Sequence, residues 1–181
     1  NKSSIEGEKI FMNNTAVILA AGYGSRLREL TNNPKSLLII NGKTLIEWHI
    51  RHLDLLNFNK IIIIVGYKYQ KIVNLIESFK YNTPIEFVQN NDYENKGNGY
   101  SMYLGLEMTD PSDNILIVDA DLVYEHKVIV NFITNHYSDS ILVGEGSLDD
   151  IECAKTLIDS EGYIRKTIDK KFVNNKELEK Y

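Results

Sequence analysis

The sequence predicts an α/β fold with a mostly parallel central sheet, helices on both faces and a β-hairpin insertion. Short apolar runs of buried-strand length alternate with segments whose apolar residues recur at the helical period. Strands that alternate with helices imply right-handed crossovers and a parallel sheet. The chain has 181 residues, 43% of them hydrophobic. This size and composition suit one α/β domain with a full core.

The apolar pattern assigns the individual elements. The expected strands are residues 15–20, 60–66, 85–89, 114–121 and 140–144. Helices are expected at residues 45–56, 72–79, 101–108 and 127–136. Two runs on either side of Ser160, Glu161 and Gly162 predict a hairpin rather than another strand–helix unit. Residues 1–13 are interpreted as a tail or linker, and residues 14–181 as the domain.

Composition excludes several classes of protein. A net charge of −5 gives no support for a nucleic-acid surface, which needs a basic excess. The longest apolar run, residues 61–65, is too short to span a bilayer, and no signal-peptide pattern opens the chain. A single cysteine, Cys153, excludes an intrachain disulfide. We therefore expect a reduced, cytoplasmic protein without a nucleic-acid or membrane partner.

A glycine loop follows the first predicted strand. Ala20, Ala21, Gly22 and Gly24 allow close approach of a ligand and expose N–H groups that can hold phosphates. The dinucleotide pattern GxGxxG fails because its third glycine falls at Leu27, and no Gly-Lys-Ser or Gly-Lys-Thr of a P-loop follows.

Two cations accompany this loop. Arg26 lies within it, and Lys35 follows it. Together they offer the multidentate and point-charge donors that a triphosphate needs. On loop chemistry alone, a tight turn with two surface cations remains an alternative.

Two carboxylates end the strand predicted at residues 114–121. Asp119 and Asp121 leave an extended strand on one face, so both can serve one Mg²⁺ directly or through water. An ion of this kind neutralises the charge of bound phosphates. The alternative is a pair of capping or turn aspartates.

The segment LAAGYGSRL followed by NPKSLL resembles the signature of the sugar-phosphate and alcohol-phosphate nucleotidyltransferases. The resemblance extends over residues 15–171 and implies a Rossmann-like nucleotidyltransferase fold. It also implies that Arg26 grips the outer phosphates, that Lys35 lies between the α-phosphate and the acceptor, and that Asp121 holds Mg²⁺ with Asp119 beside it. The loop residues that would bind the nucleotide are Leu19, Ala20, Ala21, Gly22, Gly24 and Ser25.

A polar loop at residues 89–104 bears on the choice of substrate. Its order of residues resembles cytidylyltransferases that act on phosphocholine and on inositol phosphate. By this resemblance Asn98 and Ser101 bind the nucleotide, whereas Asn90 and Tyr93 bind the acceptor. Asp169 and Lys170 resemble the family's Glu-Lys-Pro step near the acceptor phosphate, with Asp in place of Glu and Lys171 in place of Pro.

These patterns predict Mg²⁺-dependent transfer of CMP from CTP to a small phosphorylated alcohol or phosphono acceptor, with release of pyrophosphate. One alternative is a sugar-1-phosphate uridylyl- or thymidylyltransferase. Another is a regulatory domain that binds a nucleotide without turnover. Family members are usually longer and supply a second metal-binding Asp near their C-terminal end. The expected organisation therefore includes a missing C-terminal part and room for a fused domain.

Overall fold

The computed structural model describes residues 14–22, 24, 32–134, 139–144 and 153–168. The chain forms two compact units, residues 1–135 and residues 136–181. The first unit contains the central sheet and its helices, and the second contains a hairpin.

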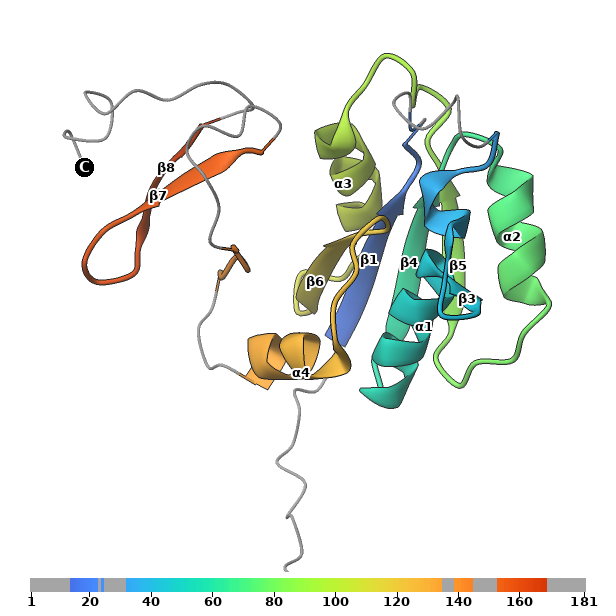
Figure 1. The fold of residues 1–181 in the computed structure, drawn as a ribbon, viewed down its shortest axis with the longest axis horizontal. Helices are drawn as coiled ribbons and strands as arrows, with labels where there is room; N and C mark the ends of the chain where they lie inside the picture. Colours follow the sequence, from blue (N-terminus) through green and yellow to red (C-terminus); the bar gives the residue numbers. More distant parts are fainter. Residues whose placement is uncertain (1–13, 23, 25–31, 135–138, 145–152, 169–181) are drawn as a thin grey trace, which may run out of the picture. The chain divides into compact units, whose positions relative to one another are not determined.

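A four-stranded parallel sheet forms the centre of the first unit, in the order β5-β4-β1-β6 (Figure 1). Its strands are β1 (Asn14–Ala20), β4 (Lys60–Val65), β5 (Ile85–Gln89) and β6 (Asn114–Asp119). Val17 lies opposite Ile62 on one side and Ile117 on the other. The apolar runs of β1 and β4 are buried because both strands lie inside a parallel sheet with covered faces. The predicted parallel sheet is confirmed.

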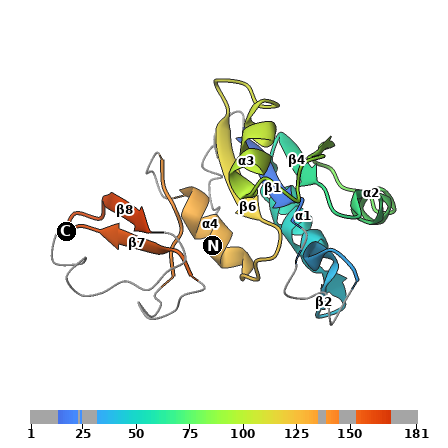
Figure 2. The same cartoon turned by 90° about the horizontal axis from the view of Figure 1, so that it is seen from above.

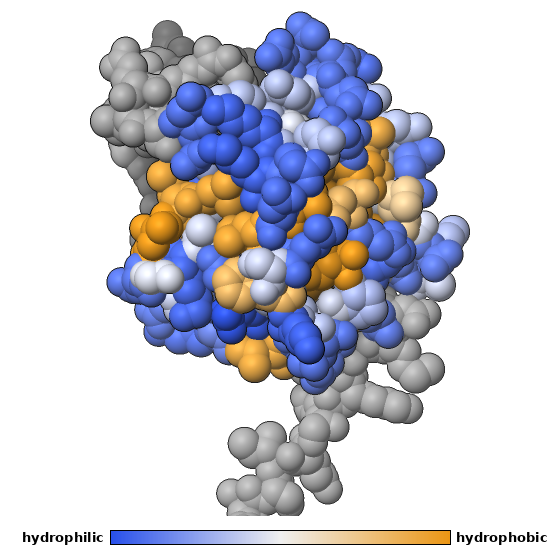
Figure 3. All heavy atoms as spheres, turned by 90° about the vertical axis from the view of Figure 1, so that its right-hand side faces the viewer, coloured by the Kyte–Doolittle hydropathy of each residue, from blue (hydrophilic) through white to orange (hydrophobic). Residues whose placement is uncertain are grey.

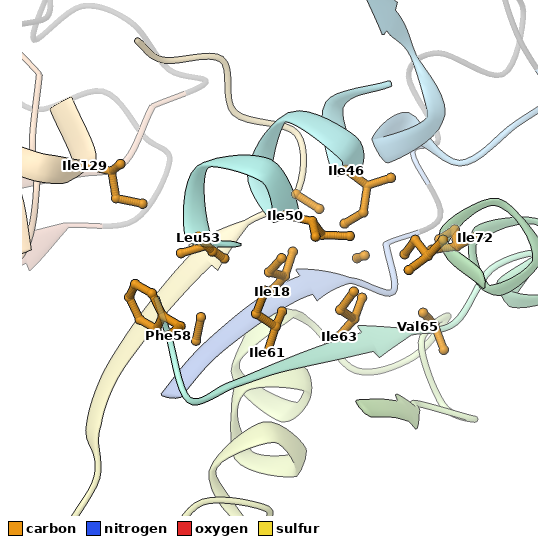
Figure 4. Close-up of a cluster of buried hydrophobic side chains, with 14 of the residues drawn as sticks. Ile18, Ile46, Ile50, Leu53, Phe58, Ile61, Ile63, Val65, Ile72 and Ile129 are labelled. Carbon is orange, nitrogen blue, oxygen red and sulfur yellow. The ribbon is translucent and has the colours of Figure 1, made fainter. Parts of the chain in front are cut away.

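One face of the sheet is covered by α1 (Leu45–Leu55), α2 (Tyr69–Glu77) and α4 (His126–Thr134), which contribute to one core cluster. Figure 4 shows Ile46, Ile50 and Leu53 of α1 directed onto Ile18, Ile61 and Ile63 of the sheet. The helix α1 begins at a capping box, in which Glu47 accepts from the Thr44 backbone N–H and the Thr44 hydroxyl accepts from the Glu47 N–H.

The opposite face is covered by α3 (Asn98–Leu106), which packs on β1 and β4 (Figure 2). A Cβ at Gly105 would overlap the side chain of Val17, so glycine at this position allows the helix to approach the sheet. Helices on both faces agree with the sequence prediction.

Two expectations about strands are wrong. Residues 140–144 form no strand, although their sequence is apolar. Ile141, Leu142 and Val143 are 55%, 59% and 44% exposed, so no neighbouring element covers them within the described residues. The strand β6 ends at Asp119, and Asp121 lies in the turn after it.

The hairpin in the second unit is confirmed. Its strands β7 (Lys155–Ile158) and β8 (Ile164–Ile168) pair antiparallel. Gly162 adopts a φ of +88° in the connecting turn, a conformation that favours glycine.

A second hairpin was not predicted. It joins β2 (Ile39–Ile40) and β3 (Lys43–Thr44). The turn is Asn41-Gly42, with φ angles of 50° and 77°. An Asn-Gly pair is typical of a two-residue hairpin turn, so this signal was present in the sequence.

No helix among the described residues is long and apolar enough to cross a membrane. On the side that carries α2, apolar side chains reach the surface in areas bordered by hydrophilic residues (Figure 3).

Candidate active site at the carboxyl edge of the sheet

The glycine loop leaves β1 at the edge where the parallel strands end. Ala21 packs against Gly66, which follows β4: a Cβ at Gly66 would lie 2.7 Å from the Ala21 carbonyl oxygen and 2.9 Å from Tyr93 Cβ. The Tyr67 N–H donates to that carbonyl at 3.2 Å. At Gly22, in contrast, a Cβ would have no described residue within 4 Å. Among the described residues, the loop is therefore anchored at Ala21 and uncovered at Gly22.

Lys35 connects the glycine loop to the end of β6. Gly24 has a φ of +63°, and a Cβ there would lie 3.0 Å from Lys35 Cγ. The Lys35 Nζ lies 3.3 Å from Asp121 Oδ2, and both side chains are partly exposed. The structure thus brings together three residues that the sequence assigned to one site.

Asp119 lies beside this pair at the end of β6. Its Oδ1 accepts a hydrogen bond from Asn98 Nδ2 at 3.0 Å, which connects the first residue of α3 to the strand. No group of three or more His, Cys, Asp and Glu in the described part of the chain can hold a metal ion. Magnesium commonly uses one or two carboxylates and takes its other ligands from water and substrate phosphates. Asp119 and Asp121 fit that requirement.

Asn90 and Ser101 have structural positions. Asn90 is fully buried, and its Nδ2 donates to Ser101 Oγ at 3.0 Å. Its Oδ1 accepts from the Asp92 N–H at 2.9 Å. Each polar atom of the Asn90 amide therefore has one partner inside the protein, and Ser101 is 3% exposed. In this structure the pair connects α3 and the polar loop to the end of β5, and the predicted ligand contacts of both residues stay predictions.

Tyr93 is partly buried against Ala21 and contacts the ring of Tyr67 with 6.2 Å between centroids. Leu19 and Ala20 lie at the end of β1, where the Leu19 carbonyl accepts from the Ala120 N–H at 3.1 Å.

Four predicted site residues lie outside the described residues: Ser25, Arg26, Asp169 and Lys170.

Sequence reasoning missed the residues that hold the segment before Lys35. The Lys68 Nζ donates to the Asn32 carbonyl and to its Oδ1, both at 2.6 Å. Lys71 donates to Asn33 Oδ1 at 2.7 Å. Their position just after β4, at the edge where ligands bind in such sheets, was the signal available.

A second missed group lies behind Asp121. His49 of α1 is 2% exposed, and its Nδ1 lies 2.8 Å from the Tyr124 hydroxyl. A cavity of about 650 Å³ adjoins it, between α1, the β2–β3 turn and the loop after Asp121. His49 lies in the helix predicted at residues 45–56, and nothing in the sequence indicated a contact with Tyr124.

Burial makes His49 a determinant of stability against acid. Desolvation, followed by the charge of His52, lowers its pKa to about 4, although the Leu122 and Ala120 carbonyls and the Asp121 carboxylate oppose this. The unfolded chain therefore takes up a proton near the ordinary histidine pKa of 6.5, whereas the folded protein does not. The free energy of unfolding is expected to fall between pH 6.5 and pH 4, by on the order of 3 kcal/mol for this group. Its contribution is complete above pH 6.5.

Urea denaturation at a series of pH values measures this loss. His49→Gln removes the titrating group and should flatten the curve relative to the wild type. His52, whose pKa burial also lowers, remains in both proteins. Equal slopes would contradict the prediction.

The fold and the site define an α/β nucleotide-handling domain, with a glycine loop, a lysine and two aspartates at one sheet edge. The chain belongs to the MobA-like NTP transferase domain family, whose model matches residues 16–148.

The chain is also similar in sequence to several curated nucleotidyltransferases. The chain is 43% identical over 107 residues to a choline-phosphate cytidylyltransferase from Streptococcus pneumoniae, covering 59% of this chain and 44% of that protein. It is 33% identical over 109 residues to a 2-aminoethylphosphonate cytidylyltransferase from Lancefieldella rimae, covering 60% and 43%. A probable UDP-N-acetylglucosamine pyrophosphorylase from Acanthamoeba polyphaga mimivirus is 32% identical over 120 residues, covering 66% and 46%. The chain thus spans less than half the length of these relatives.

Among solved structures, an inositol-1-phosphate CTP transferase from T. maritima matches with a TM-score of 0.69 and 20% identity. The match covers 90% of this chain and 66% of that one. At this identity the likeness shows the fold alone.

Proposed function

We propose that the chain is the nucleotide-handling part of a Mg²⁺-dependent nucleotidyltransferase that transfers CMP from CTP to a phosphorylated small alcohol or a phosphono acceptor. The observation that carries this proposal is the contact of Lys35 with both Gly24 and Asp121. It places a cation and a carboxylate beside a glycine loop in a domain of the NTP transferase family.

In the proposed reaction, an oxygen of the acceptor phosphate attacks the α-phosphorus of the nucleotide in line. A new P–O bond forms as the bond to the β-phosphate's bridging oxygen breaks, and pyrophosphate leaves with that electron pair. Because the acceptor phosphate is already anionic, the step needs no general base. Catalysis then depends on positioning and charge neutralisation.

Each residue of the site has a separate role in the proposed reaction. Open backbone at Gly22 receives the phosphates, while Lys35 balances charge that develops on the α-phosphate. Arg26 contributes a second, multidentate cation. Asp121, with Asp119 beside it, would hold Mg²⁺, which supplies charge neutralisation on the phosphates when bound.

The preference for CTP rests on the polar loop and on the relatives. Two of the relatives are cytidylyltransferases by name. A base pocket that pairs with cytosine leaves polar groups unsatisfied when uracil enters, at about 1–3 kcal/mol per group. We expect CTP to exceed UTP, dTTP, ATP and GTP by at least about tenfold in specificity constant, which corresponds to roughly 1.4 kcal/mol.

A pyrophosphate-release screen of the full-length protein tests both substrates. The acceptors are phosphocholine, inositol phosphate, aminoethylphosphonate and hexose 1-phosphates, each with every NTP. Calorimetry with each NTP and Mg²⁺ gives a check that needs no acceptor. Preference for UTP or dTTP in both assays would assign the protein to nucleotide-sugar synthesis, and binding without turnover on any acceptor would support a regulatory domain.

A further inference from the structure

The turn that carries Asp121 is anchored to the sheet mainly at its start. The Ala120 N–H donates to the Leu19 carbonyl at 3.1 Å, whereas the Leu122 N–H reaches the Asp119 carbonyl at the long distance of 3.4 Å. Beyond Asp121, Leu122 and Val123 are 49% and 67% exposed. The sheet therefore holds the turn only on the N-terminal side of Asp121.

Tyr124 anchors the other side of the turn. Its ring is partly buried and packs against the main core cluster. Its hydroxyl lies 2.8 Å from Nδ1 of His49, in the helix α1. The turn is thus held between β1 and α1, with Asp121 in the middle.

The backbone on both sides of Asp121 affects the electrostatics of His49. The carbonyls of Ala120 and Leu122 act on its ring and raise its pKa against the effect of burial. Nε2 is buried and forms no hydrogen bond with a described residue, so the Tyr124 hydroxyl is the partner that the structure gives to this ring. A neutral imidazole has one N–H donor and one acceptor nitrogen. A proton on Nε2 leaves Nδ1 to accept from the Tyr124 hydroxyl.

We propose that His49 is a positioning residue for the site. It fixes residues 120–124 through the hydrogen bond with Tyr124, and so sets the place of the Asp121 carboxylate relative to Lys35. The inference rests on the proposed function only in taking Asp121 as a magnesium ligand. Residues that orient a metal ligand contribute about 10- to 100-fold to metal affinity or activity.

The test compares three variants with the wild type. His49→Phe keeps a ring and removes both nitrogens, while Tyr124→Phe removes only the hydroxyl. His52→Phe is the matched control, because His52 lies one turn further along α1, lines the same cavity and contacts the Tyr124 ring at 5.5 Å between centroids. Three readouts apply: Mn²⁺ affinity in the presence of CTP by electron paramagnetic resonance, the Mg²⁺ concentration for half-maximal turnover, and hydrogen exchange at residues 121–124.

In His49→Phe we expect Mn²⁺ binding weakened about tenfold or more, the Mg²⁺ requirement raised by the same factor, and faster hydrogen exchange in the turn. Tyr124→Phe should show smaller changes in the same direction, and His52→Phe should match the wild type. Saturating Mg²⁺ should restore much of the lost turnover.

Wild-type metal affinity and Mg²⁺ dependence in a folded His49→Phe would overturn the proposal, even with faster exchange. An equal loss in His52→Phe would do the same, because it would indicate a general packing effect. If His49→Phe does not fold, Tyr124→Phe decides by the same readouts. A wild type without turnover on any NTP would instead overturn the proposed function, and hydrogen exchange would still show whether His49 holds the turn.

Discussion

Asp121→Asn is expected to abolish turnover at ordinary Mg²⁺ concentrations while the protein remains folded. The substitution removes the charge that would hold the ion and keeps the shape of the side chain. Asp121 is half-exposed in a turn and is not part of the core, so the melting temperature should change little. Partial rescue by high Mg²⁺ is expected because a neutral amide oxygen is a weaker ligand than a carboxylate.

Pyrophosphate release, measured against Mg²⁺ concentration, checks this result. Asp110→Asn is a matched control, because Asp110 is exposed in the loop before β6. If Asp121→Asn kept the wild-type rate and metal dependence, Asp121 would be a turn residue without a metal role.

Lys35→Ala is expected to lower turnover by about 10²-fold or more, the effect of losing one preorganised electrostatic donor. The structure adds a reason for a large effect: the aliphatic stem of Lys35 packs against Gly24, which restricts where its ammonium group can lie. Lys35→Arg keeps the charge but not the compact head group, and should recover only part of the rate.

Steady-state kinetics with CTP and the best acceptor measures this effect. Lys80→Ala, which removes an exposed lysine beyond α2, controls for the change in net charge. A Lys35→Ala rate within a factor of two of wild type would remove Lys35 from the catalytic group.

The sheet was predictable from sequence because a buried parallel strand leaves a local signal. Residues 61–65 are apolar without interruption, and the structure buries all of them in β4. Residues 140–144 carry the same local signal and form no strand, because a strand also needs a partner that the local sequence does not specify. The end of β6 at Asp119 was missed for a similar reason. The apolar pattern of a strand does not show at which residue its hydrogen bonds to the neighbouring strand end.

The sequence indicated which residue types gather at this edge of the sheet, but not their contacts. Lys35 and Asp121 are separated by 86 residues, and only the assembled sheet brings them together. Asn90 was predicted to contact a ligand from its place in a polar loop. Nothing in the sequence indicated that the fold buries this residue and joins its amide to Ser101 and Asp92. His49 gave no signal, because a histidine in an amphipathic helix has the same pattern whether or not it contacts a functional loop.

At Lys68, the requirements of thermal stability and of an ordered active site conflict. Its φ of 48° lies in the left-handed region, which costs a residue with a side chain roughly 1–2 kcal/mol. A glycine would relieve that strain and would also remove the two hydrogen bonds from the Lys68 ammonium group to Asn32, leaving only the 3.0 Å bond from the Tyr67 hydroxyl among the described contacts of that side chain. A laboratory selection for heat resistance alone would therefore favour glycine at this position. Selection for turnover would retain lysine, because it contributes two of the hydrogen bonds that hold the segment before Lys35.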